Sequence, residues 1–178
     1  MMTSVIGAPI KSRPRNQTGF TLLEVLVVVL IIGITLSLAV INLGDRQEDL
    51  IEEEGRRLSA LIKLASEEAI MNGEELGLML GEKSYLFSRL EGEEWQPLAE
   101  DRQFRQRQFP HGMTLGLELE ERPVILDEDQ EQPHIFILSS GELTPFLLTL
   151  RSADEVWKYE LTGHFNGQLR GNGPTYIP

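Results

Sequence analysis

One carboxylate stands at the start of a long apolar run, a position in which a charged group is energetically costly. Glu24 follows the residues Thr18-Gly19-Phe20-Thr21-Leu22-Leu23, and residues 25–41 contain no charged side chain. An ionised carboxylate at membrane depth costs at least about 2.5 kcal/mol, so such groups usually find a partner or perform a function. We therefore expect Glu24 either to pair with another polar group or to perform a function.

The other side chains that could take part in catalysis or ligand binding do not form a pattern that predicts an enzyme or a cofactor site. His111, His134 and His164 lie far apart and none has the His-Glu-x-x-His spacing, so we expect no metal site and no general base. Residues 81–84, Gly-Glu-Lys-Ser, lack the adjacent Gly-Lys pair of a phosphate loop and are expected to form a hairpin turn. There is no Gly-x-Ser-x-Gly elbow, and Ser139-Ser140 is expected to end a strand.

An acidic stretch at residues 127–131 could attract Ca²⁺, which favours clustered oxygen ligands. The calcium-loop pattern is not met, because Gln132 stands where glycine is needed and Leu138 where a bidentate glutamate belongs. We expect a solvated acidic loop, with calcium binding as the alternative.

One basic and aromatic patch interleaves Arg102, Arg105 and Arg107 with Phe104 and Phe109. Nucleic-acid binding would use such residues. We expect instead an ordinary edge strand or a surface that docks on an acidic neighbouring subunit.

The composition fits one soluble domain with an N-terminal segment and argues against nucleic acid as a partner. The chain has 178 residues, 41% of them apolar, and a net charge of −12. Lys11, Arg13 and Arg15 all precede the apolar run, so without residues 1–19 the chain has 13 basic and 28 acidic residues, a net charge of −15. Such a field repels phosphate backbones. The absence of cysteine excludes disulfides and thiolate chemistry.

Residues 20–41 are predicted to cross a membrane. As a helix they extend about 33 Å, which matches a hydrocarbon core of roughly 30 Å. The preceding basic residues predict a cytoplasmic N-terminus and place residues 45–178 outside. Three forms are open: a secretory signal cut after Ser37-Leu38-Ala39, an uncleaved anchor, and a segment cut between Gly19 and Phe20. The third leaves a free amine on Phe20, four residues before Glu24.

The motif Gly19-Phe20-Thr21-Leu22-Leu23-Glu24, between basic residues and an apolar helix, resembles the class III signal of type IV pilins and type II secretion pseudopilins. The resemblance implies that a prepilin peptidase cuts after Gly19 and methylates the new amine of Phe20. It also implies that Glu24 attracts the N-terminal amine of a neighbouring subunit during assembly. Two groups that are each costly in lipid become tolerable when they pair, so pairing would favour subunit addition.

Past Asp45 the sequence predicts an amphipathic helix that ends at Asn72-Gly73. Gly44 and Gly55 are expected to loosen or bend it. One face carries apolar residues at helical spacing and is expected to pack on a sheet: Leu50, Ile51, Leu58, Leu61, Ile62, Ala65 and Ala69.

After Gly73 the apolar period changes from helical to alternating, which predicts strands with one buried face. Residues 134–138 are apolar on both faces and are expected to form a central strand. The predicted fold is therefore α+β, a long N-terminal helix packed on an antiparallel β-sheet region. Turns are expected at Gly81-Glu82, Glu91-Gly92, Pro110-His111-Gly112, Ser140-Gly141 and Asn166-Gly167.

Residues 136–146, Phe-Ile-Leu-Ser-Ser-Gly-Glu-Leu-Thr-Pro-Phe, followed by Trp157 and Gly163, are similar to the C-terminal β region of general secretion pathway protein H, the H-type minor pseudopilin. Together the two resemblances touch residues 14–73 and 134–170. They imply a type IV pilin-like fold with a leader at 1–19, a transmembrane helix at 20–44, an amphipathic helix at 45–73 and a periplasmic β-rich domain at 74–178.

The implied function is structural. The resemblance implies a minor pseudopilin of the bacterial inner membrane that assembles near the tip of a type II secretion pseudopilus and supports export of folded proteins. Its implied partners are other pseudopilins, the prepilin peptidase and exported substrate proteins, with no nucleic acid. One alternative is a minor type IV pilin of the FimT or FimU kind, in pilus assembly or DNA uptake. Another is a periplasmic binding or enzymatic domain on a simple anchor.

Overall fold

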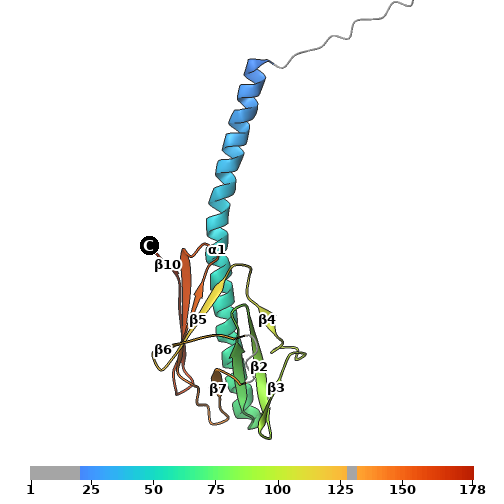
Figure 1. The fold of residues 1–178 in the computed structure, drawn as a ribbon, viewed down its shortest axis with the longest axis vertical. Coiled ribbons are helices and arrows are strands. Elements are labelled where there is room, and N and C mark those ends of the chain that lie inside the picture. Colours follow the sequence, from blue (N-terminus) through green and yellow to red (C-terminus); the bar gives the residue numbers. More distant parts are fainter. Residues whose placement is uncertain (1–20, 128–131) are drawn as a thin grey trace, which may run out of the picture. The chain divides into compact units, whose positions relative to one another are not determined.

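The computed structural model describes residues 21–127 and 132–178, without the side chains of residues 37–45. The chain divides into two compact units, Met1–Val40 and Ile41–Pro178. One helix, α1 (Leu22–Asn72), begins in the first unit and continues into the second, where ten strands follow it among the described residues (Figure 1).

The helix ends where the sequence predicts. Gly73 follows it with φ +66°, and the backbone N–H of Glu74 donates to the carbonyl of Ala69 at 3.1 Å. A left-handed glycine that closes such a bond satisfies carbonyls that the helix leaves without partners, and a residue with a Cβ would be strained there.

The first sheet has the order β3-β2-β1-β7, and β4 pairs with the start of β2. Its pairings are antiparallel, and Leu78 of β1 lies opposite Phe87 of β2. The turn between β1 and β2 is closed by the N–H of Gly81, which donates to the carbonyl of Ser84 at 2.8 Å, as expected for residues 81–84. The strands are β1 (Leu76–Leu80), β2 (Ser84–Glu91), β3 (Glu94–Pro97), β4 (Arg107–Gln108) and β7 (Ile135–Ile137).

The second sheet has the order β10-β9-β8-β5-β6, again with antiparallel pairings. Leu148 of β8 lies between Leu117 of β5 and Leu161 of β9. The predicted Asn166-Gly167 turn joins β9 to β10, with Gly167 at φ +77°. The strands are β5 (Thr114–Leu119), β6 (Arg122–Val124), β8 (Phe146–Arg151), β9 (Trp157–Gly163) and β10 (Leu169–Tyr176).

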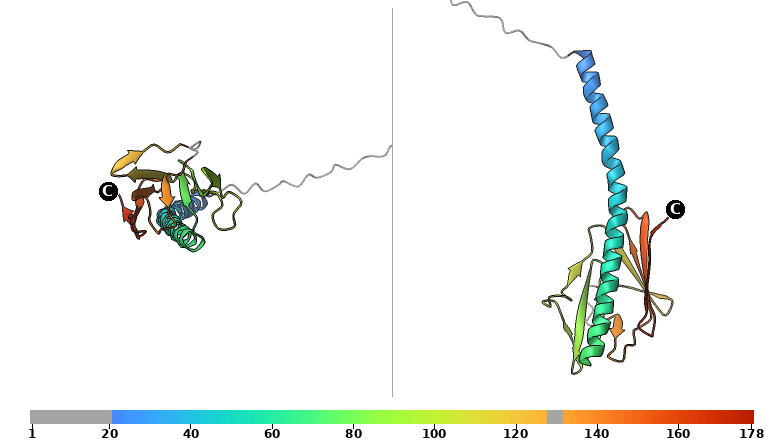
Figure 2. Two further views of the ribbon diagram at one scale, coloured as in Figure 1. Left: turned by 90° about the horizontal axis from the view of Figure 1, so that it is seen from below. Right: turned by 180° about the vertical axis from the view of Figure 1, so that it is seen from behind.

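The second-unit part of α1 packs on both sheets, and the right-hand view of Figure 2 shows green strands on one side of it and red strands on the other. The predicted apolar stripe of the helix is buried, and it joins one core with the inward residues of both sheets. The α+β architecture with antiparallel sheets is therefore confirmed. The buried stripe residues of α1 are Ile51, Leu58, Ile62, Ala65 and Ala69.

The prediction of a central strand at residues 134–138 is wrong. In the described residues the strand is β7, three residues long, at the end of the first sheet. Ile135 and Ile137 are fully buried, whereas Phe136 points to the outer face and is 36% exposed. Its ring packs against Trp95 of β3, with ring centroids 5.6 Å apart. The second apolar face therefore reflects an aromatic contact on the outside of the sheet.

Gly55 has a different role from the expected loosening of the helix. Helix α1 continues through Gly55, and a Cβ built there would collide with the ring of Tyr159 on β9. The same tyrosine meets Gly171 of β10, where a Cβ would collide with its hydroxyl oxygen. Two glycines thus make room for one ring between the helix and the second sheet.

His134 ends the pairing between β1 and β7. The residue is 5% exposed, and Nδ1 accepts a hydrogen bond from the N–H of Leu80 at 3.2 Å. Nδ1 can accept only in the neutral ring, and Nε2 has no hydrogen-bond partner in the described residues. Burial lowers the pKa of His134 because the imidazolium would be poorly solvated.

We expect acid to destabilise the second unit through His134. The unfolded chain takes up the proton near pH 6.5, above the folded-state pKa. The stabilising contribution is therefore complete above about pH 6.5 and is lost as the pH falls toward the folded-state pKa. Denaturation midpoints at pH 7.5, 6.5 and 5.5 should fall less for His134→Asn, whose Oδ1 can accept the same bond. His111→Asn, at an exposed histidine, is the matched control, and equal slopes for His134→Asn and wild type would contradict the assignment.

Candidate functional site

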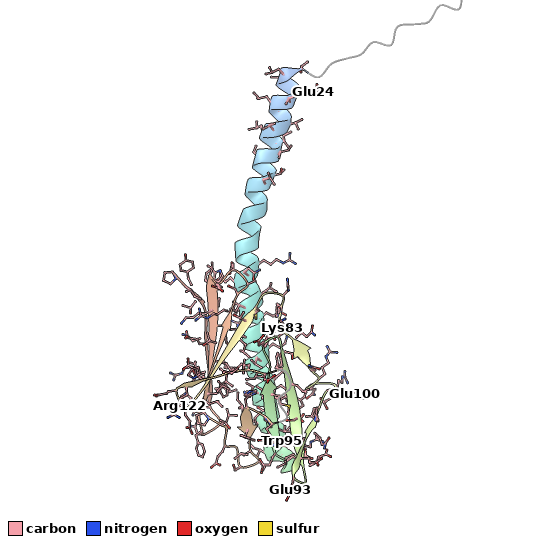
Figure 3. All side chains as sticks on the ribbon, viewed as in Figure 1. Glu24, Lys83, Glu93, Trp95, Glu100 and Arg122 are labelled. Atoms are coloured by element: carbon pink, nitrogen blue, oxygen red, sulfur yellow. The ribbon has the colours of Figure 1, made fainter. Side chains whose placement is uncertain are left out.

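Helix α1 begins with a cap that includes Glu24. The backbone N–H of Glu24 donates to the hydroxyl of Thr21 at 3.2 Å and to the carbonyl of Thr21 at 3.0 Å. Thr21 therefore occupies the cap position, and Thr-x-x-Glu is the spacing of a capping box. Glu24 stands in the first helical turn, where a carboxylate also complements the helix dipole (Figure 3).

The helix that follows Glu24 is apolar on all sides. Every described side chain from 21 to 36 is exposed within its own unit, and the large apolar ones are 43–85% exposed. Thr35 conceals its hydroxyl by donating to the carbonyls of Ile31 and Ile32 at 2.9 Å each. A helix of this kind is stable only in an apolar environment, which lipid or neighbouring helices can supply.

Within the described residues, no helix meets the length and hydropathy that a membrane crossing requires.

The terminal amine of Phe20, the predicted partner of Glu24, lies outside the described residues. Gly19 and Phe20, at the expected cleavage and methylation site, are not among the described residues, and neither are the side chains at the C-terminal end of the predicted span 20–41. Cleavage after Gly19, methylation of Phe20 and pairing of its amine with Glu24 therefore stay predictions.

A second carboxylate, Glu54, lies in the core of the second unit. Glu54 is 1% exposed, and its Oε1 accepts a hydrogen bond from the hydroxyl of Tyr85 on β2 at 3.0 Å. Its Oε2 pairs with Arg57 one turn further along α1, and Arg57 also reaches Glu53 at 2.6 Å. A buried carboxylate needs such partners, and both of its oxygens have one.

Tyr85 is fixed as the donor of this bond. Burial, the neighbouring Glu54 charge and the bond itself raise the pKa of Tyr85 well above its usual value of about 10. The phenol therefore stays protonated at physiological pH. Because the bond joins the helix to the first sheet, its evident role is to set how α1 lies on β2.

The sequence contained a signal for Glu54. The residue falls three positions after Ile51 and four before Leu58, in the middle of the apolar stripe. A charged residue at such a position predicts a buried partner. Tyr85, 31 residues away, could not be identified from the helix pattern.

We predict that Tyr85→Phe destabilises the fold by about 1–3 kcal/mol, because Glu54 keeps its burial and loses a donor. The free energy of unfolding from chemical denaturation measures the effect. Tyr176→Phe is the matched control, since Tyr176 is 60% exposed, and it should change stability by less than about 0.5 kcal/mol. Equal effects of the two substitutions would argue against the buried bond.

The basic and aromatic patch does not form a stacking platform. Phe104 is 2% and Phe109 is 8% exposed, and their rings pack on Phe87 and Tyr85 with centroids 5.1 and 5.2 Å apart. Arg102 and Arg105, next to these two buried phenylalanines, are exposed. Aromatic side chains that belong to the core cannot stack on bases, so only the arginines are available to a partner.

The remaining sequence candidates lie apart from one another. Ser139 lies in the turn after β7. Its N–H and hydroxyl both donate to the carboxylate of Glu75, at 3.0 and 2.7 Å. His111 and His164 are exposed in turns. Of the acidic stretch 127–131, residues 128–131 lie outside the described residues, and among the described residues no group of three metal-ligating side chains comes together.

Comparison with protein families gives two matches along this chain. Residues 14–40 match the model of the prokaryotic N-terminal methylation motif. Residues 54–167 match the model of type II transport protein GspH. The two matches thus cover Glu24 with its helix and most of the second unit.

Curated relatives and solved structures agree with these matches. The chain is 33% identical to type II secretion system protein H of Aeromonas hydrophila, over 83% of this chain and 87% of that protein. It is 34% identical to the protein of the same name from Pseudomonas aeruginosa, over 76% and 84%. The minor pseudopilin EpsH of the Vibrio cholerae type 2 secretion system superposes with a TM-score of 0.60 at 26% identity, over 70% of this chain and 98% of that one. Escherichia coli GspH, 21% identical with a TM-score of 0.57 over 71% and 90%, shows the shared fold.

Proposed function

Because the chain belongs to the type II transport protein GspH family, we propose that it assembles into a type II secretion pseudopilus through its N-terminal helix. It is a minor pseudopilin of the H type. In the proposed cycle, a prepilin peptidase cuts between Gly19 and Phe20 and methylates the Phe20 amine. Glu24 then pairs with the terminal amine of a neighbouring subunit.

The observation that supports this proposal most directly is a carboxylate in the first turn of a wholly apolar helix. Glu24 is the only charged residue from 20 to 41, and the described side chains around it find no cover within their own unit. An apolar surface of this extent needs lipid or other helices, and the acid needs a cation. A neighbouring subunit with a free N-terminal amine supplies both.

The second unit, on this proposal, lies in the periplasm and the first unit anchors the chain in the inner membrane. The work is structural, with no catalysis: the subunit sits near the tip of the pseudopilus, contacts the other pseudopilins and supports export of folded proteins. The alternative role in a minor type IV pilin is not favoured, since the aromatic residues of the basic patch are buried and the relatives are secretion proteins.

Deletion of the gene in the bacterium that encodes the chain, followed by complementation, tests the function. Proteins exported by the type II system should stay in the periplasm of the deletion strain and return to the medium with the wild-type chain. Mass spectrometry of the mature protein should show residues 20–178 with one added methyl group. Normal export in the deletion strain, or a mature chain that begins at Val40, would refute the proposal.

A further inference from the structure

Three large apolar side chains are exposed on segments that meet at the end of the second unit where α1 terminates. Ile70 is 53%, Met71 is 81% and Phe165 is 59% exposed. The other large apolar side chains exposed among the described residues of this unit are Ile125, Phe136 and Tyr176, which lie on other segments. A soluble unit exposes single apolar residues routinely, whereas a group of them indicates an interaction surface.

Contacts among three segments bring together the parts of the chain that carry these residues. A Cβ built on Gly141, in the loop after β7, would lie 3.4 Å from Cδ1 of Ile70. A Cβ built on Gly167, in the β9–β10 turn, would lie 2.6 Å from the carbonyl oxygen of Gly141. The N–H of Leu143 donates to the carbonyl of Phe165 at 3.1 Å. We call the surface formed by residues 67–75, 138–143 and 163–168 the helix-end surface.

The helix-end surface is held rigidly, as a docking surface must be if binding is not to cost ordering entropy. The carboxylate of Glu75 accepts both bonds from Ser139, which fixes the loop after β7 to the residues that follow α1. The β9–β10 turn is closed by the N–H of Gly167, which donates to the carbonyl of His164 at 2.9 Å. The glycine at 141 leaves Ile70 uncovered on this side.

The charged side chains of the three segments have one sign. The three segments contain the five carboxylates Glu67, Glu68, Glu74, Glu75 and Glu142 and no Lys or Arg. Lys63 and Arg89, from adjoining elements, are already paired with Glu67 at 4.0 Å and Glu74 at 2.9 Å. Figure 3 places Glu93, in the turn between β2 and β3, at this same end of the unit. A partner that carries Lys or Arg around an apolar patch would complement this surface.

We propose that the helix-end surface docks on a lysine- and arginine-rimmed apolar patch of a neighbouring pilin-like subunit. The proposal rests on the proposed function, which makes another subunit of the assembly the partner. Ile70, Met71 and Phe165 are the apolar anchors of the contact, and the carboxylates select the positively charged partner. A symmetric contact between the helix-end surfaces of two copies of this chain is excluded, because both surfaces have the same negative sign.

Cross-linking in membranes of the encoding bacterium tests the proposal, and the cysteine-free chain makes the attachment site unique. The full-length M71C chain is labelled with a maleimide–succinimidyl ester reagent, which joins the new thiol to a nearby lysine amine. We expect a cross-link to a lysine of a second protein that itself carries the N-terminal methylation motif. The I125C chain, altered at a residue that is 92% exposed and outside the surface, should not capture that lysine.

Substitutions in the M71C background decide whether the surface is responsible. Phe165→Arg or Glu142→Arg should lower the yield of the cross-link about tenfold, as loss of an interface anchor or of charge complementarity does, and neither adds an amine that could react with the reagent. Ile125→Arg in the same background should leave it unchanged. The proposal is overturned if no cross-link forms, if Phe165→Arg leaves the yield intact, or if the captured lysine belongs to a second copy of this chain. These outcomes do not depend on secretion, so the proposed function fails separately if the deletion strain exports normally.

Discussion

Glu24→Gln should yield a processed, membrane-inserted and folded chain that does not enter the pseudopilus. An unpaired amine left in lipid costs about 2.5–3.5 kcal/mol, which corresponds to roughly a hundredfold weaker subunit addition. The helix start should survive, because glutamine can take the place of glutamate in a capping box with Thr21. Loss of the dipole interaction removes only about 0.3–1 kcal/mol. Pseudopilus fractions and exported protein in the medium are the measurements.

One further variant tests whether the charge at Glu24 is sufficient, and a control tests whether any carboxylate of the helix matters. Glu24→Asp keeps the charge on a shorter side chain and should restore part of the activity. Asp49→Asn removes an exposed carboxylate of the same helix outside the apolar segment and should have no effect. Wild-type incorporation and export by Glu24→Gln would show that the carboxylate serves only the helix cap.

Replacing Gly55 by leucine should destabilise the second unit by about 3 kcal/mol or more. A side chain there would occupy the space of the Tyr159 ring, and neither the helix backbone nor β9 can retreat without opening the core. Folded domains have only about 5–15 kcal/mol of stability in total, so the loss is large. Unfolding of the full-length protein in detergent, followed by tryptophan fluorescence, would measure it.

A double-mutant cycle identifies the cause. Gly55→Ala combines a gain of up to about 1 kcal/mol in helix propensity with the collision, so it should be less harmful in a Tyr159→Leu background. Ala60→Leu, which adds similar bulk at an exposed position of α1, should change stability by less than about 0.5 kcal/mol. If Gly55→Leu is as mild as Ala60→Leu, Tyr159 does not pack as described.

The helix end and the hairpins could be predicted because their causes are local. Gly73, Gly92 and Gly167 adopt positive φ at turns that their own dipeptides specify. The leucines of β1, β5 and β8 alternate because one face of each strand meets the core. Such patterns depend on neighbours in sequence and are legible without a structure.

Strands β3, β6 and β10 were not predicted, because their residues do not alternate, whereas β4 lies in the stretch expected to form an edge strand. β10 contains Gly171, Gly173 and Pro174 and is mostly exposed, so its strand conformation follows from pairing with β9. The same limit applies to the site. Glu24 and its apolar helix were predicted from sequence, whereas the Glu54–Tyr85 bond depends on tertiary packing between segments far apart in the chain. The role of Gly55 depends likewise on Tyr159.

The bonds made by Glu74 and Glu75, directly after α1, have a mechanical consequence. Directly beyond the helix, the carbonyl of Glu75 accepts the N–H of Leu90 at 2.9 Å, its carboxylate holds Ser139, and Glu74 pairs with Arg89. A load applied along the second-unit part of α1 therefore enters the first sheet through several bonds in parallel, so no single bond carries it alone. The helix and that sheet should bear tension and compression as one stiff body, and strain should appear elsewhere in the subunit first.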